Sequence, residues 1–410
     1  MGIMEKIRAL FARDSVLVIS VFAALLSCIA VPPDAEYVVY VDWHTLVLLF
    51  CLMTVVAGLR FLGVIRILGE WVVKRMHSKV MIATALLALT FCCSMFITND
   101  VALITFVPFA IVVMHRASMD AYMGPVVALM TIAANLGSML LPMGNPQNLY
   151  LFQASGMDVA SFVWLMMPYT VFAAVLLLIF LLVVFRKKDS ENTPQNQQQV
   201  SEQRVSGQQA RAAAENTGKR CLLISHRKLP FRKCFCAVVY AVLFVVCLCA
   251  VANLINVYTV GLVVLVVVLL VDRKILARID YGLLFTFIVL FIFVGNMGRI
   301  PVIHDVVSQL IGAVPVLASV LVSQVISNVP AALLLSGFTN QWHALIVGTN
   351  LGGLGTLIAS MASIISFKLI TTEGLVKRGV YLRTFTMYNV VFLLLLLILY
   401  AVLAYTGIAA

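Results

Sequence analysis

Long apolar runs dominate this chain, and polar residues are confined to short interruptions between them. A helix that crosses a bilayer needs about 20 largely apolar residues. The segments that approach this length are predicted to be membrane-spanning helices, and they are 15–31, 43–58, 121–152, 159–185, 234–252, 254–271, 281–296, 342–370 and 384–405. The pattern predicts an all-α polytopic membrane protein with about nine full spans.

Two further apolar stretches, 80–114 and 314–338, are interrupted near their middle by polar residues. The interruption reads Thr-Asn-Asp at 98–100 in the first stretch and Ser-Asn-Val-Pro at 327–330 in the second. Each stretch is too long for one straight span and too short for two comfortable ones. We expect both to be re-entrant helical hairpins whose polar tips meet at mid-membrane.

The composition excludes an ordinary soluble protein. The chain is 63% hydrophobic and only 11% charged, whereas soluble domains are roughly 45–50% apolar and about 25% charged. A disordered chain and a nucleic-acid binder are excluded on the same grounds, and membrane lipid is the expected surroundings. The spans contain no nucleotide-binding loop, zinc-protease motif or nucleophile elbow, so an enzyme is not expected.

Most of the formal net charge of +11 comes from one segment, 186–233, which holds eleven Lys/Arg and four Asp/Glu. Its Gln/Asn/Ser-rich part cannot bury a core. The positive-inside rule places this segment in the cytoplasm as a linker. The basic stretches 60–79, 273–278 and 377–383 lie on the same side, whereas the acidic loop 32–42 lies outside. This orientation predicts a cytoplasmic N-terminus, an external C-terminus and hairpins that open toward opposite faces.

Opposite hairpins suggest an inverted repeat, and the sequence carries matching landmarks in the same order. Val-Asp-Trp at 41–43 pairs with Ile-Asp-Tyr at 279–281, and the two hairpin tips pair with each other. Asn-Leu-Gly occurs at 135–137 and again at 350–352. We predict a first repeat over 1–185, the linker over 186–233, an extra transmembrane helix over 234–253 that inverts the second copy, and a second repeat over 254–410.

Each repeat also contains a helix broken by Pro or Gly. The helix over 121–152 is interrupted by Pro-Met-Gly-Asn-Pro at 142–146, and the helix over 342–370 by Gly-Gly-Leu-Gly at 352–355. Irregular backbone at membrane depth is tolerated only where it lines a cavity or is buried in protein. Backbone carbonyls with Asn, Ser and Thr oxygens suit a hard cation such as Na⁺, and exposed helix N-termini suit an anion.

Asp100 is the only carboxylate at the centre of an apolar stretch. An ionisable group at that depth is a functional hypothesis by default. It could bind a cation or carry a proton. Alternatively it caps the returning helix, and both roles can coexist.

These motifs resemble the ion transporter superfamily, in particular its arsenite permease, sodium–proton antiporter and citrate transporter-like group. Residues 98–108 resemble the first hairpin of arsenite permeases. Ser-Asn at 327–328 resembles the tip of divalent anion/sodium symporters, with Val329 in place of Thr. The stretches 144–152 and 323–331 are most similar to those of anion-permease-like bacterial inner-membrane proteins.

The resemblance implies an elevator-type secondary transporter of the bacterial inner membrane, often a homodimer, in which a transport subdomain moves against a scaffold. It implies no cofactor beyond Na⁺ or H⁺ as coupling ion. The small ion substrate would lie between the tips. By the family pattern the first Na⁺ site comprises Thr98, Asn99, Gly144 and Asn145, and the second comprises Ser327, Asn328, Ala359 and Ser360. Further candidate site residues are Asp100, Asn148, Asn350 and Gly355.

The departures from the pattern bear on the substrate. Val329 lacks a hydroxyl that contacts carboxylate substrates in the symporters, and Asp100 adds a negative charge that would repel a dianion unless it is protonated or cation-bound. We expect a Na⁺- or H⁺-coupled anion permease for an inorganic oxyanion or a small carboxylate such as citrate. A Na⁺/H⁺ antiporter, an arsenite efflux permease and an uncoupled channel or facilitator remain alternatives.

Overall fold

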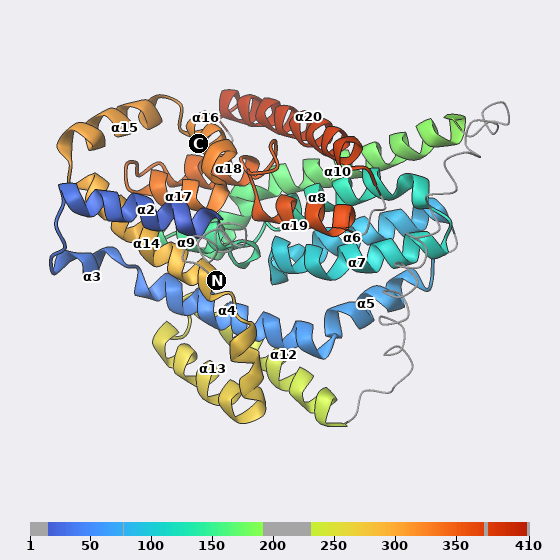
Figure 1. Cartoon of the computed structure of the whole chain (residues 1–410), viewed down its shortest axis with the longest axis horizontal. Helices are drawn as coiled ribbons and strands as arrows, with labels where there is room; N and C mark the ends of the chain where they lie inside the picture. The colour runs from blue at the N-terminus through green and yellow to red at the C-terminus, as the bar shows by residue number, and fades with distance from the viewer. Residues whose placement is uncertain (1–14, 77, 192–230, 373–375, 408–410) are drawn as a thin grey trace, which may run out of the picture. The chain divides into compact units, whose positions relative to one another are not determined.

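The structure is a computed structural model that describes residues 15–76, 78–191, 231–372 and 376–407. Within these residues every regular element is helical (Figure 1). The first part of the chain contains α2 (Ser15–Ala30), α3 (Glu36–Tyr40), α4 (Trp43–Leu62), α5 (Val64–Val73), α6 (Lys79–Ile97), α7 (Asn99–Arg116), η1 (Asp120–Tyr122), α8 (Met123–Gly137), η2 (Pro142–Gly144), α9 (Pro146–Ser155) and α10 (Val159–Glu191). Most of the predicted linker lies outside the described residues.

The second part of the chain begins with the predicted extra helix, α12. Its elements are α12 (Phe231–Val251), α13 (Val257–Asp272), η5 (Arg273–Arg278), α14 (Tyr281–Gly298), α15 (Pro301–Ala313), α16 (Pro315–Ile326), α17 (Asn328–Ser336), α18 (Trp342–Leu351), α19 (Met361–Thr372) and α20 (Arg378–Tyr405). Both predicted broken helices are interrupted as expected, between α8 and α9 and between α18 and α19.

Seven helices in the described residues are long and apolar enough to cross a bilayer, by length and composition alone: α4, α6, α7, α10, α12, α14 and α20. An eighth span results if the bent pair α15 and α16 is counted as one. The expected number was about nine. Five of the seven helices match predicted spans, whereas α6 and α7 are the arms of the predicted first hairpin, and the predicted spans at 121–152 and 342–370 are broken helices. The predicted spans at α2 and α13 have only 16 residues each, which is about 24 Å of helix and less than the hydrocarbon thickness.

The first hairpin is longer than the sequence pattern indicated. We expected 80–114 to be too short for two spans, but α6 has 19 residues and α7 has 18, so each arm is long enough to cross by itself. The expected length was wrong because the helices include Lys79 at one end and His115 and Arg116 at the other. These polar residues lie outside the apolar stretch from which the length was predicted. The second hairpin is short as predicted, with arms of 12 and 9 residues.

The helices form two compact units. Unit 1 comprises Met1–Gly58, Asn145–Phe162 and Val239–Gly353, and unit 2 comprises Leu59–Gly144, Val163–Val238 and Leu354–Ala410. The boundaries at Gly144 and Gly353 fall inside the two helix breaks. Each broken helix therefore gives one half to each unit. The units follow neither the predicted repeats nor a division into scaffold and transport subdomains, and both of these stay predictions.

In unit 2, the hairpin arms α6 and α7 lie against each other and against α8 (Figure 1). α19 packs on α7 and α8, and α20 packs on α8. Gly137 lets α8 approach α6 closely, because an added Cβ would stand 2.6 Å from Ser94 Oγ and closer still to the backbone oxygen of Phe91. Small residues at such crossings allow helix backbones to pack tightly in membranes.

In unit 1, the second hairpin packs in the same manner on α18, and α9 packs on both α17 and α18. α14 lies along α2 and also contacts α17. Each unit thus contains one hairpin, the helix that precedes one break and the helix that follows the other break. Chain segments far apart in sequence meet in this way around each hairpin tip.

A polar cluster in unit 1 fastens α2 and α3 to the end of α14. Asn296 Nδ2 donates to Ser27 Oγ at 2.9 Å and to the Tyr37 hydroxyl at 2.8 Å, and the Asn296 side chain is fully buried. Arg299 donates to Asp34 Oδ2 at 2.6 Å. This hydrogen bond holds the pKa of the Asp34 carboxyl below its ordinary value and raises the pKa of the guanidinium. The ion pair is part-exposed, so it adds little to stability.

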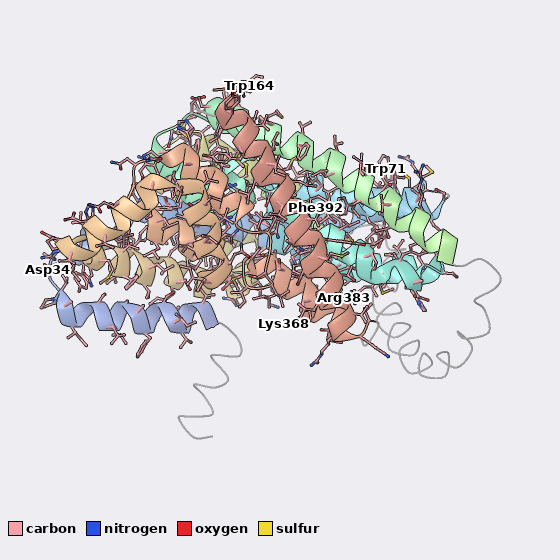
Figure 2. All side chains as sticks on the ribbon, turned by 90° about the horizontal axis from the view of Figure 1, so that it is seen from above. Asp34, Trp71, Trp164, Lys368, Arg383 and Phe392 are labelled. Atoms are coloured by element: carbon pink, nitrogen blue, oxygen red, sulfur yellow. The ribbon has the colours of Figure 1, made fainter. Side chains whose placement is uncertain are left out.

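Figure 2 labels four charged or aromatic side chains of unit 2, of which Arg383 and Phe392 belong to α20, Lys368 to α19 and Trp164 to α10. In this view Lys368 is seen near the end of α20 that carries Arg383, Phe392 lies in the middle of α20, and Trp164 is seen near its other end. Cationic and aromatic side chains at helix ends are typical of membrane–water interfaces.

Candidate functional site

The tip of the first hairpin is a single residue between two helices. α6 ends at Ile97, α7 begins at Asn99, and Thr98 between them has φ 67° and ψ 149°. This region of backbone space is essentially restricted to glycine, and a residue held there stores about 1–3 kcal/mol of strain. Strained backbone of this kind clusters at binding and switch sites. The break is where the sequence predicted it.

A chain of hydrogen bonds fixes this tip within unit 2. The backbone N–H of Asp100 donates to Asn99 Oδ1 at 2.9 Å, and Asn99 Nδ2 donates to Asn135 Oδ1 at 3.0 Å. Ser360 Oγ, just before α19, donates to the same Asn135 oxygen at 3.1 Å. Asn99, Asn135 and Ser360 are all at least 95% buried. One amide on α8 therefore joins the hairpin tip to the start of α19.

Asp100 lies in the first turn of α7 and is half-buried. A carboxylate at this position is stabilised by the helix dipole, typically by about 0.3–1 kcal/mol. This contribution fits the capping role that the sequence left open. It is too small to explain why a charge is placed in an apolar stretch, so a role in ion binding or proton transfer stays a prediction.

Glycines shape the backbone at both breaks. An added Cβ on Gly144 would stand 2.8 Å from the carbonyl carbon of Ser138, so η2 folds back directly onto the end of α8. In the second break, Gly355 has φ 104°, a conformation that is strained for any other residue. Ala359, close behind it, is fully buried. These positions belong to unit 2.

The tip of the second hairpin repeats the conformation of the first. Ser327 has φ 74° and ψ 155°, between α16 and α17, and α17 begins at Asn328. Gln324, one turn before the tip, donates to the backbone oxygen of Gly352 at 3.0 Å. The Asn328 amide lies close to Gly353, the residue after Gly352. Its Nδ2 is 2.9 Å from the point that a Cβ added to Gly353 would occupy. The second tip thus lies against the break that follows α18.

α9, the second half of the first broken helix, also packs beside the end of α18 in unit 1. Asn350, in the last turn of α18, donates from Nδ2 to Asn148 Oδ1 of α9 at 2.7 Å and to the backbone oxygen of Ile346 at 2.8 Å. Asn145 is the N-cap of α9, with Pro146 at the first helical position. Pro is favoured there because its missing N–H has no helical partner. Asn145, Asn148 and Asn350 are all buried.

The predicted site residues therefore fall into two groups. Unit 2 holds Thr98, Asn99, Asp100, Gly144, Gly355, Ala359 and Ser360, and unit 1 holds Asn145, Asn148, Ser327, Asn328 and Asn350. The two predicted Na⁺ sites each combine residues of both units, and those combinations stay predictions. The described residues contain no group of three His, Cys, Asp or Glu side chains that could hold a metal ion.

Asn135 contacts the first tip and Gln324 contacts the second break, but the sequence did not select either of them as a site residue. Asn135 carried a usable signal, because it matches Asn350 in the Asn-Leu-Gly landmark. Gln324 is one turn before the predicted tip, and a polar residue at that spacing points to the same helix face.

Replacing Thr98 with glycine tests the strain at the first tip. The Thr98→Gly variant is expected to be more stable by roughly 1 kcal/mol, because relief of the strained dihedrals exceeds the added entropy of the unfolded chain. Thermal melting of the purified protein in detergent measures this effect. Thr98→Val, which has a similar shape and keeps the strain, should not raise the melting temperature. Equal melting of both variants would show that Thr98 is unstrained.

Residues 2–340 match the citrate transporter family, CitMHS. This match covers most of the 410 residues. The chain belongs to the citrate transporter family. It is accordingly a multi-pass membrane transporter of an anion-transporting family, in agreement with its apolar helices. The resemblance drawn from the tip and break motifs is confirmed at the level of the family.

Three relatives of this member of the citrate transporter family align with most of its length. An uncharacterized transporter of Methanocaldococcus jannaschii, MJ0456, is 27% identical over 345 residues, 83% of this chain and 84% of the relative. The inner membrane protein YbiR of Escherichia coli is 27% identical over 333 residues, 80% of each chain. A 46 kDa membrane protein of Mycobacterium leprae is 24% identical over 367 residues, 82% of this chain and 80% of the relative.

Proposed function

We propose that this chain is a secondary active transporter that couples the movement of a small anion to Na⁺ or H⁺. The substrate is an inorganic oxyanion or a small carboxylate such as citrate, the anion in the family's description. The protein acts in the inner membrane of a bacterium, as the name of the Escherichia coli relative suggests. Its N-terminus is cytoplasmic and its C-terminus external, and it works as a homodimer.

The observation that carries this proposal is the repeated arrangement of a strained polar tip against a broken helix, once in each unit. Thr98 and Ser327 adopt nearly the same dihedral angles, and each is followed by a buried Asn that begins a helix. The N-termini of α7 and α17 carry partial positive charge that favours an anion. Neutral side-chain and backbone oxygens beside them suit a hard cation.

The same repetition supports alternating access. Transporters built from inverted repeats bind substrate where discontinuous helices of the two halves meet, and they expose the site by moving one part against another. In this proposal the two repeats are inverted by α12, and an elevator movement of a transport subdomain carries the tips across the membrane. The equivalent tips and equivalent breaks are the features that support it.

A second candidate function is favoured by Asp100. A half-buried carboxylate beside the first tip suits a cation or proton better than a dianion. The chain would then be a Na⁺/H⁺ antiporter or an arsenite efflux permease. Residues 98–108 resemble the first hairpin of arsenite permeases. An uncoupled facilitator would use the same path without an ion gradient.

Uptake into proteoliposomes distinguishes these functions. Purified protein is reconstituted and assayed with labelled citrate, succinate, sulfate and arsenite, under an inward Na⁺ gradient, an inward H⁺ gradient or neither. We expect saturable uptake of at least one anion that requires one of the gradients. Uptake of no anion, with Na⁺-driven H⁺ movement instead, would favour the antiporter, and equal fluxes with and without gradients would favour the facilitator.

Two Asn variants of unit 1 test the role of the second tip in this assay. Asn328→Ala removes the buried amide at the second tip and should reduce uptake by about tenfold or more. Asn340→Ala changes an exposed loop residue and should leave uptake unchanged. Equal uptake by the two variants would mean that the second tip is not part of the site.

A further inference from the structure

The short helix α5 joins α4 and α6, two helices that are long and apolar enough to cross a bilayer. It has 10 residues, which is about 15 Å of helix and half the hydrocarbon thickness. Gly63, between α4 and α5, has φ 78°, a left-handed conformation that commonly ends a helix. The chain thus leaves the bilayer at the end of α4 and enters it again at the start of α6. α5 lies between these two points, at the membrane boundary.

One face of α5 packs on the first hairpin. α5 contacts both arms of that hairpin, α6 and α7. Ile65 and Gly69 are one turn apart and both are buried. A Cβ added to Gly69 would stand 3.3 Å from the ring of Phe106 and 3.4 Å from the ring of Phe109. This face of α5 is therefore inside the protein.

The opposite face of α5 is apolar and exposed. Ile67, Leu68 and Trp71 are each 47% exposed or more, and Ile67 and Trp71 are one turn apart on the same side of the helix. Phe61, just before α5, is also exposed. A helix of this kind lies in the membrane interface with its apolar side chains at the level of the acyl chains, and Trp is enriched at the level of the headgroups.

Cationic side chains follow this apolar face at the end of α5. Lys74, Arg75 and Lys79 are all exposed. The guanidinium carbon of Arg75 is 3.6 Å from the centroid of the Trp71 ring, a cation–π contact that holds this charge beside the ring. The charge is thereby placed where Trp71 meets the headgroup level.

The positive charge of this segment is not balanced within it. Glu70 is the only acid from 60 to 79, and Arg66 Nε donates to its carboxylate at 2.9 Å. Lys74 and Lys79 form no ion pair among the described residues. Lys79 is the first residue of α6, where the helix dipole disfavours a cation. The stability of α6 therefore does not explain why a Lys is placed there.

The combination of an apolar face and adjacent cations restricts the ligand. A free phosphate would pair with Lys and Arg but would leave the apolar face uncovered. An anionic phospholipid satisfies both parts, because its headgroup reaches the cations while its acyl chains cover the apolar side chains. Basic segments next to a membrane-spanning helix are attracted to anionic lipids in this way.

We infer that α5 and the basic residues that follow it form a binding site for an anionic phospholipid such as phosphatidylglycerol. Lys74 and Arg75 bind the headgroup, and Ile67, Leu68 and Trp71 contact the upper part of the acyl chains. The site does not depend on which ion or anion the protein transports. Since α5 packs on both arms of the first hairpin, the bound lipid lies against the helix that supports the first tip.

Thermal melting of the full-length protein in detergent micelles tests this site. Phosphatidylglycerol, phosphatidylcholine or inorganic phosphate is titrated at constant ionic strength, because a ligand that binds only the folded state raises the melting temperature. We expect phosphatidylglycerol alone to stabilise the protein. The double variant Lys74→Gln/Arg75→Gln should need about tenfold more phosphatidylglycerol for a half-maximal effect. The control Arg273→Gln/Lys274→Gln removes two exposed charges from η5 and should stay within about twofold of wild type.

Four outcomes of the titration would overturn the inference. Equal stabilisation by the two phospholipids would mean that the site has no preference for an anionic headgroup. Stabilisation by inorganic phosphate equal to that by phosphatidylglycerol would mean that the cations bind a free anion. An unchanged response in the Lys74→Gln/Arg75→Gln variant would place the site elsewhere, and an equal loss in both double variants would mean that only net charge matters.

Quenching of Trp71 fluorescence tests the site without changing its charges, should the double variant fail to fold. The chain has four Trp residues, so a variant with Trp43→Phe, Trp164→Phe and Trp342→Phe reports Trp71 alone. It is reconstituted in equal mixtures of phosphatidylglycerol and phosphatidylcholine in which one lipid or the other is brominated. We expect stronger quenching by brominated phosphatidylglycerol. Equal quenching by both lipids would contradict the preference, and no quenching by either would mean that protein, such as a second copy of the chain, covers this face.

Discussion

Transport by an Asp100→Asn variant is expected to lose its dependence on pH. Asn keeps the size and the helix-start position of the side chain but cannot exchange a proton. If Asp100 carries the coupling proton, or must be neutralised before an anion binds, the pH profile of the wild-type rate disappears in the variant. We expect coupled uptake to fall by about tenfold or more.

The alternative, a capping role alone, predicts a different size of effect. Loss of a favourable charge in the first turn of α7 costs about 0.3–1 kcal/mol of stability and leaves the pH profile unchanged. Initial rates of proteoliposome uptake across a pH series, with melting temperatures measured in parallel, separate the two roles. Asp120→Asn is the matched control, because Asp120 is an exposed acid of the same unit. An unaltered profile in Asp100→Asn would make Asp100 structural.

Replacing Gly137 with alanine is expected to be the most destabilising of the substitutions considered. The added methyl group would overlap the backbone oxygen of Phe91 and stand 2.6 Å from Ser94 Oγ. A backbone atom cannot move aside as a flexible side chain does, so α8 and α6 must separate. Overpacking of this kind costs typically 1–3 kcal/mol, and we expect a loss near the upper end, roughly 3 kcal/mol.

Gly124 of the same helix provides the control. A Cβ there would meet only the methyl groups of Val376, at 3.6 Å or more, and alanine is favoured over glycine inside helices by about 1 kcal/mol. Gly124→Ala should therefore melt at or above the wild-type temperature, whereas Gly137→Ala should melt well below it. If the two variants melted alike, the close crossing of α6 and α8 would not be a feature of the folded protein.

The sequence predicted the positions of the tips and breaks accurately. A polar triplet such as Thr-Asn-Asp at 98–100 stands out in an apolar run, and both tips occur at the first residue of each predicted interruption. The predicted helix ends were less accurate, because a helix can continue through polar residues after the apolar pattern stops. His115 and Arg116 extend α7 beyond the apolar stretch, which is why the first hairpin was predicted too short.

The partners of the tips were beyond reach from the sequence alone. Asn99 bonds to Asn135 and, through it, to Ser360, which is 225 residues from Asn135. Neither periodicity nor hydropathy indicates that the second half of one broken helix packs with the first half of the other.

The accumulation ratio of the transported anion tests the central claim most directly. Proteoliposomes are held at zero membrane voltage, an ion gradient of about tenfold is imposed, and the internal and external anion concentrations are measured at steady state. A coupled transporter should accumulate the anion severalfold, since a tenfold gradient stores about 1.4 kcal/mol per coupled ion. Equal concentrations on both sides, at any Na⁺ or H⁺ gradient, would contradict coupled transport.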